Sequence, residues 1–231
     1  MASPPAGGRF KLMKPEVHRR LVCSIEGLEK TGKDHLALTA NGDACVLDFD
    51  QNLEGVLLKF PEKKVYVCSY EYITDTDSQN AALDVWMQFK KDYTEGLRSF
   101  PNVIVDTGSQ MWTVARMARF GKLSSVPPMA YGPINTEIKE LIRQAKEADC
   151  NTMFLHRLKP VYVGKDRTDR WEMNGFGEFG YEVQATLQTY REDGEFHVRI
   201  VNCAQNMTIA GVDLEGEECN FNTILDMVFE S

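Results

Sequence analysis

Short apolar runs that alternate with helical stretches constrain the fold of this chain more than any other feature. The runs cover residues 21–25, 44–49, 64–69, 102–105 and 151–156. Each is short and largely apolar, as strands buried on both faces of a parallel sheet are. Between them, apolar side chains recur every three or four positions at 80–97 and 134–148, which predicts helices. We therefore expect an α/β fold, a mainly parallel sheet flanked by helices.

Three regions depart from this alternation. Residues 1–19 are rich in Pro and Gly with a basic cluster, which is typical of a flexible arm or linker, so the folded domain is expected to span 20–231. After Pro160 the sequence becomes charged and glycine-punctuated, which predicts a loop. Alternating residues around 181–190 and 196–202 predict antiparallel strands added at one edge of the sheet.

Composition narrows the class of protein further. A length of 231 residues suits one domain with an appendage, and the net charge of −8 gives the surface no general attraction for nucleic acid. The six cysteines are scattered with no C-x-x-C pair, so we expect them to be reduced and mostly buried. No stretch approaches a membrane span and no apolar leader is present, so the cytoplasm is the expected location.

A phosphate-loop motif follows the first apolar run directly. Residues 27–34, GLEKTGKD, fit G-x-x-x-x-G-K between a predicted strand and a predicted helix. In such a loop, backbone N–H groups surround an anion and the lysine reaches its terminal phosphates. The alternative is a plain glycine turn before a helix. The expected cofactor is ATP with Mg²⁺, and the expected contacts are Gly27, Leu28, Glu29, Lys30, Thr31, Gly32, Lys33, Asp34 and His35.

Asp34 departs from the motif, because Ser or Thr usually places a hydroxyl on the metal at this position. A carboxylate can also bind magnesium, although it adds negative charge beside the phosphates. Asp106 closes an apolar strand, where such ATPases place a magnesium carboxylate, so Asp34 and Asp106 are the expected metal residues. Asp48 and Asp50 follow another strand; Asp50 could orient the attacking water, and the alternative for both is turn or helix capping.

His156 ends the run 151–156 and should reach the same rim of the sheet, where it could sense a γ-phosphate. A lone histidine often satisfies only a local hydrogen bond, and this alternative stays open.

In this order, the phosphate loop, the Asp48/Asp50 pair, Asp106 and His156 resemble the RecA-like ATPase core. Two segments, 131–135 and 154–159, are similar to a phage group of nucleotide-binding proteins related to single-strand annealing proteins. The resemblance implies that Asp50 is the catalytic carboxylate, that Asp106 assists magnesium, and that His156 couples nucleotide state to DNA-binding loops. It places those loops near 121–132 and 159–180.

The second of these segments can be interpreted independently of the resemblance. Basic and aromatic side chains alternate there, as in a track for single-stranded DNA with stacking platforms. The residues expected to bind DNA are Lys159, Lys165, Arg167, Arg170, Trp171 and Phe176. Asp166, Asp169, Glu172 and Glu178 offset the local positive charge, so a solvated loop is the alternative.

The hypothesis that unites these features is a RecA-like recombination or single-strand annealing protein whose ATP hydrolysis is coupled to single-stranded DNA. It implies a homo-oligomer, ring or filament, assembled through the arm that carries Phe10, with a single-strand DNA-binding protein as a further partner. If the chain is phage-encoded, the cytoplasm is that of a bacterial host. One alternative is a nucleotide-binding scaffold or switch with little turnover because of Asp34, and another is a small-molecule phosphotransferase.

Overall fold

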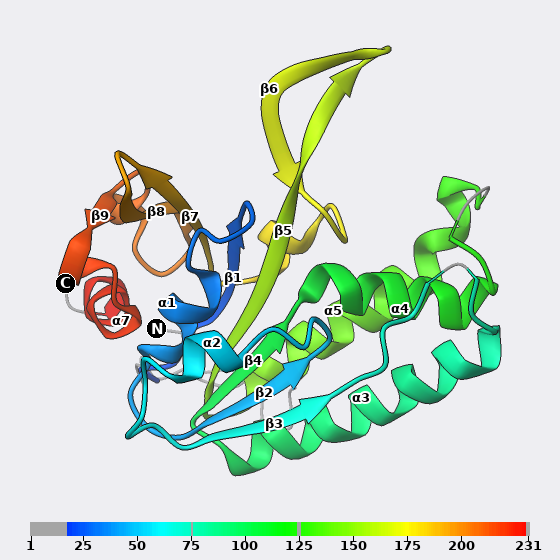
Figure 1. Ribbon diagram of the computed structural model, residues 1–231, viewed down its shortest axis with the longest axis horizontal. Coiled ribbons are helices and arrows are strands. Elements are labelled where there is room, and N and C mark those ends of the chain that lie inside the picture. Colours follow the sequence, from blue (N-terminus) through cyan, green and yellow to red (C-terminus); the bar gives the residue numbers. More distant parts are fainter. Residues whose placement is uncertain (1–17, 75, 124–125, 230–231) are drawn as a thin grey trace, which may run out of the picture.

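The computed structural model describes residues 18–229 except 75, 124 and 125, so the expected arm lies almost wholly outside the described residues (Figure 1). The described chain forms one sheet of nine strands in the order β3-β2-β4-β5-β1-β7-β8-β9, with β6 paired to β5. The strands are β1 (Val22–Gly27), β2 (Ala44–Asp48), β3 (Val65–Ser69), β4 (Asn102–Asp106), β5 (Asn151–Val163), β6 (Asp166–Met173), β7 (Ala185–Glu192), β8 (Glu195–Cys203) and β9 (Asp213–Glu215). The strands from β3 through β7 in this order are parallel, and β8 and β9 are antiparallel additions at one edge. The expected α/β architecture is confirmed.

Helices cover both faces of the sheet (Figure 1). They are α1 (Lys33–Leu38), α2 (Glu54–Leu57), α3 (Gln79–Ser99), α4 (Gly108–Phe120), α5 (Gly132–Glu147), α6 (Phe179–Glu182) and α7 (Phe221–Phe229), with 3-10 turns at Pro128–Tyr131, Met207–Ile209 and Gly216–Glu218. Two helices begin at side-chain caps, because Ser78 accepts a hydrogen bond from the Ala81 N–H and Thr107 accepts one from the Gln110 N–H. A polar capping residue directly before an amphipathic run therefore sets the start of both α3 and α4.

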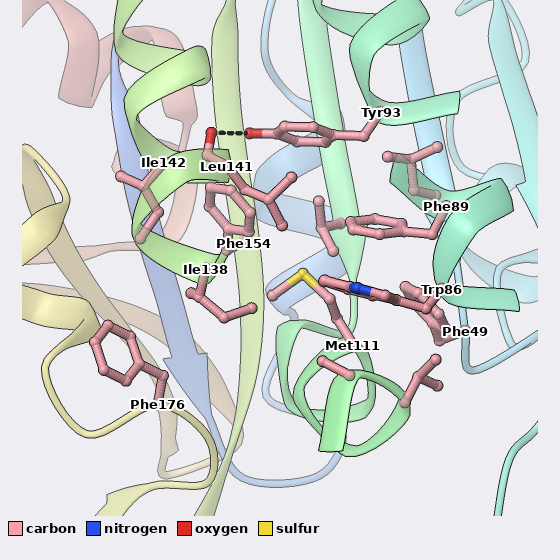
Figure 2. Packing of buried hydrophobic residues seen from close by; sticks show 14 of the residues in the cluster. Phe49, Trp86, Phe89, Tyr93, Met111, Ile138, Leu141, Ile142, Phe154 and Phe176 are labelled. Carbon is pink, nitrogen blue, oxygen red and sulfur yellow. Dashed lines mark hydrogen bonds between the residues drawn. The ribbon is translucent and has the colours of Figure 1, made fainter. Parts of the chain in front are cut away.

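Alternate residues of each central strand enter two different cores. In β4, Val103 and Val105 pack with α3, α4 and α5, whereas Ile104 packs on the face covered by α1 and α7. Figure 2 shows the first core, in which the Tyr93 hydroxyl donates to the Leu141 carbonyl at 2.9 Å and so ties α3 to α5. Burial on both faces explains why these strands are apolar along their whole length.

The region after Pro160 corrects the sequence prediction. It forms a β-hairpin, because β5 continues to Val163 and pairs with β6, and this hairpin projects well beyond the body of the domain (Figure 1). Past Arg157 the strand has lost its pairing with β1, and the register shifts between Pro160 and Tyr162. A proline is tolerated at such a bulge in a two-stranded ribbon, so it ends no strand here.

Smaller differences lie near the other edge. The strand expected around 181–190 begins only at Ala185, because α6 occupies the chain up to Glu182. β7 also pairs with β1 in parallel, and the antiparallel additions begin with β8. All six cysteines are unpaired, and four of them are buried, as expected. Among the described residues, no helix is both long and apolar enough to span a bilayer.

Candidate functional site

A cavity of about 980 Å³ opens at the carboxyl ends of the parallel strands, where open α/β sheets bind ligands. Its wall includes most of the segment 27–35, residues after β2 and β4, and residues of β5, β6 and β8. Among the expected contacts, only Thr31 is absent from the wall. The register explains this convergence, since Gly27, Asp48, Asp106 and Arg157 stand at the same ends of neighbouring parallel strands.

The segment 27–32 is held in place by a contact with β7. Thr31 is buried, and its hydroxyl meets the Thr189 hydroxyl of β7 at 2.8 Å and donates to the Leu28 carbonyl at 3.0 Å. The Thr31 side chain therefore shapes the loop from behind, and only its backbone could contact a ligand. Gly32 has φ of +89°, and a Cβ there would lie 2.9 Å from the Phe196 ring, so both conformation and space require glycine.

Lys33 is buried at the start of α1, and its ammonium folds back onto the loop. It donates to the carbonyls of Gly27 at 3.1 Å and Leu28 at 2.8 Å. Burial lowers the pKa of Lys33, while the nearby carboxylates of Asp34 and Asp106 act in the opposite direction. An anion in the cavity would give this ammonium a charged partner in place of two neutral carbonyls.

Asp34 and Asp106 place two carboxyl groups together beside Lys33. Burial raises the pKa of both groups, and for Asp106 the neighbouring carboxylates of Asp34, Asp50 and Asp48 raise it further. The Asp34 Oδ1 atom is buried and has no hydrogen-bond partner. A divalent cation would relieve both features, because it pairs the carboxylates and supplies the missing contact of Oδ1.

The residues therefore fit a magnesium ion that takes the rest of its ligands from phosphate and water. Within the described chain, no group of three or more His, Cys, Asp or Glu side chains is placed to hold a metal alone.

Asp50 and Asp48 separate into different roles. Asp50 lines the cavity and forms an ion pair with Arg157 of β5, which also lines it. Asp48 instead accepts hydrogen bonds from the backbone N–H groups of Asp50 at 3.0 Å and Gln51 at 2.7 Å. Asp48 thus stabilises the turn that places Asp50 at the cavity. For Asp48, this is the turn-capping role that the sequence left open as an alternative.

The structure corrects the expectation for His156. Its ring is 1% exposed, lies against Phe179 with ring centroids 4.5 Å apart, and shares a hydrogen bond of 2.9 Å between Nδ1 and the Ser24 hydroxyl. Burial lowers the pKa of His156 to about 3, so the ring is neutral at physiological pH. Side chains alternate along a strand, so His156 enters the core and Arg157, the next residue, faces the cavity.

The hairpin holds five of the six residues expected to bind DNA. Lys159 pairs with Glu172 at 3.3 Å, the Arg167 guanidinium lies over the Trp171 ring at 5.0 Å, and Lys165 and Arg170 are exposed. Trp171 also reaches the wall of the cavity.

Phe176 is a correction, because it is 4% exposed and belongs to the first core (Figure 2). Its ring centroid lies 6.0 Å from that of Trp112. Because the Phe176 ring is buried, a base cannot reach it to stack, and the Lys139 ammonium also lies over it at 5.7 Å.

Sequence reasoning missed Arg157 and Phe196 as site residues. The period of two along a strand shows that Arg157 and His156 face opposite sides of the sheet, but it does not say which of them faces the cavity. Phe196 comes from β8, far along the chain, and nothing local to it marks a ligand site.

The strand order and register define a mixed α/β fold with a mainly parallel sheet, and comparison with solved structures shows that this fold is RecA-like. The crystal structure of the RadB recombinase is similar to this chain, with a TM-score of 0.50 and 10% sequence identity over 84% of this chain and 86% of that chain. No protein-family model matches the sequence, and no curated protein matches it significantly. At this level of identity the likeness establishes the fold alone.

Proposed function

We propose that the chain binds ATP with Mg²⁺ in this cavity, hydrolyses it, and acts on single-stranded DNA through the β5–β6 hairpin. The observation that carries the nucleotide part is the convergence of one buried ammonium, Lys33, with the paired carboxyls of Asp34 and Asp106 in one cavity. The buried, unpartnered Oδ1 of Asp34 supports a cation at this place. A triphosphate with its metal supplies the missing partner for each of these groups.

Each cavity residue has a role in this proposal. Lys33 would leave the carbonyls of Gly27 and Leu28 and pair with the terminal phosphates, while Asp34 and Asp106 would hold the cation. Bound Mg²⁺ supplies charge stabilisation to the phosphates during transfer. Asp50 would orient the attacking water once Arg157 exchanges its carboxylate partner for phosphate oxygens.

The DNA part rests on the shape and chemistry of the hairpin. It projects from the domain and exposes Tyr162, Trp171 and several cations, which suits stacking of bases with contacts to the phosphate backbone (Figure 1). Trp171 belongs to both the hairpin and the cavity wall, so nucleotide binding and hairpin position share a residue. Assembly into a ring or filament, through the arm or another segment, is part of the same proposal.

One assay tests the coupling of these two parts. Phosphate release from Mg²⁺-ATP is measured with and without single-stranded DNA, and we expect the DNA to stimulate it. ATP binding without turnover, with or without DNA, would favour the scaffold or switch instead, for which the carboxylate of Asp34 at the usual hydroxyl position is the supporting observation. Turnover that depends on a small-molecule acceptor would favour a phosphotransferase.

Removing the Trp171 ring should weaken DNA binding selectively. We expect Trp171→Ala to lower the affinity for a single-stranded oligonucleotide roughly 5- to 100-fold, the range for loss of one stacked base. Tyr181→Ala is the matched control, because Tyr181 is an aromatic residue that is 90% exposed on α6, outside the hairpin. Fluorescence anisotropy at fixed salt measures both variants. Equal effects in the two, or none in Trp171→Ala, would contradict the assignment of DNA binding to the hairpin.

A further inference from the structure

Part of the cavity wall is aromatic, and none of the roles proposed above for binding phosphate or metal involves it. His35 of α1 and Phe196 of β8 both line the cavity, next to the aliphatic side chain of Val56. The two rings are nearly parallel, with an interplanar angle of 5° and centroids 6.3 Å apart. They come from segments about 160 positions apart in the chain, so the fold itself brings them together.

Neighbouring residues hold both rings in place. The Arg191 guanidinium lies over the Phe196 ring at 4.2 Å, and the Phe60 ring lies 4.9 Å from that of His35. Phe196 also touches Gly32, the second glycine of the loop, closely enough that a Cβ there would be 2.9 Å from its ring. The aromatic wall is therefore a preformed surface directly beside the loop that would hold the phosphates.

We infer that the ring pair His35 and Phe196 forms the subsite for the base of the nucleotide. This inference rests on the proposed nucleotide site, and it adds the part of the ligand that the charged residues do not contact. Two near-parallel rings impose one orientation on a third planar ring that stacks on either of them. The bases are planar, and stacking on an aromatic side chain is favourable for every base because each has a π-face.

The same wall predicts the selectivity of the subsite. Stacking grows with the area of the ring system, so the two fused rings of a purine gain more contact than the single ring of a pyrimidine. ATP should therefore bind several-fold more tightly than CTP.

The test separates the base from the phosphates. Binding of ATP, CTP and inorganic tripolyphosphate, each with Mg²⁺, is measured by calorimetry for the unmodified chain, Phe196→Leu and Phe196→Tyr. Leucine keeps apolar volume against Gly32 but lacks a ring, whereas tyrosine keeps the ring. We expect Phe196→Leu to weaken ATP binding roughly 5- to 100-fold and tripolyphosphate binding less than about twofold. Phe196→Tyr should restore ATP affinity to within about threefold.

Three results would overturn the inference. Unchanged ATP affinity in Phe196→Leu would mean that the base does not touch this ring. Equal weakening of ATP and tripolyphosphate would mean that the ring only supports the loop, and thermal melts of each variant identify a loss of folding as the cause. If the unmodified chain binds neither ligand, the proposed nucleotide site fails, and the base subsite fails with it.

Discussion

Replacing Lys33 with alanine should abolish measurable ATP binding under conditions where the unmodified chain is saturated. Charge-assisted hydrogen bonds contribute about 1.5–3 kcal/mol each, so loss of the Lys33 ammonium should weaken binding at least about 10- to 100-fold. The free protein should remain folded, because the ammonium makes only two bonds to the carbonyls of Gly27 and Leu28. Calorimetric titration with Mg²⁺-ATP measures the affinity.

Lys64→Ala is the matched control for this change. Lys64 is an exposed lysine directly before β3, and it does not line the cavity. We expect its affinity for ATP to match that of the unmodified chain. ATP affinity that is unchanged in Lys33→Ala would refute the assignment of the segment 27–34 as a phosphate loop.

Replacing Asp106 with asparagine should change stability and activity in opposite directions. Its pKa is raised in the folded protein by burial and by the adjacent carboxylates, so the unfolded chain loses this proton at a lower pH than the folded chain does. Asp106 therefore does not destabilise the folded protein below the pKa that it has in the unfolded chain, about 4. As the pH rises from there toward its pKa in the folded protein, the free energy of unfolding falls. Asparagine does not ionise, so the variant avoids this loss.

We expect Asp106→Asn to unfold, without nucleotide, at a temperature about 2–4 °C higher near neutral pH, the shift for roughly 1 kcal/mol in a chain of this size. The advantage should shrink as the pH approaches 4. Magnesium-dependent turnover should fall roughly 10- to 100-fold, because a residue that helps to hold the cation is gone. Calorimetric melts between pH 4 and 8 and phosphate release measure the two effects.

Asp84→Asn, on the exposed face of α3, removes the same charge away from the cavity. Its melting temperature and turnover should stay close to those of the unmodified chain. If Asp106→Asn lowers the melting temperature of the free protein at neutral pH, burial and the neighbouring carboxylates do not disfavour the ionised form of Asp106, and this account is wrong.

The sequence was informative where local chemistry decides structure. The apolar runs predicted five of the parallel strands, because a strand buried on both faces needs apolar residues throughout, as β4 shows with Val103, Ile104 and Val105. β3 is the exception, because it lies at the edge of the sheet and is only partly buried. The spacing of glycines around Lys33 likewise predicted the loop, since Gly32 takes a positive φ and lies against a ring. These features depend on residues close to each other in the chain.

The rest depended on contacts between distant residues. The hairpin was missed because Pro160 and the charges of β6 indicate a loop, whereas a two-stranded ribbon outside the core tolerates both. Choosing Arg157 over His156 required knowing which face of β5 lines the cavity, and that depends on how β5 packs in the sheet. The burial of Phe176 depends on its packing against Trp112, and the position of Phe196 depends on the pairing of β7 with β8.

The most direct test of the central claim is a crystal structure of the chain with a non-hydrolysable ATP analogue and Mn²⁺ in place of Mg²⁺. The account predicts one anomalous peak within coordination distance of both the Asp34 and Asp106 carboxylates, with the terminal phosphate bound to the Lys33 ammonium. An analogue bound at saturating concentration elsewhere on the domain, or a metal peak away from both carboxylates, would contradict it.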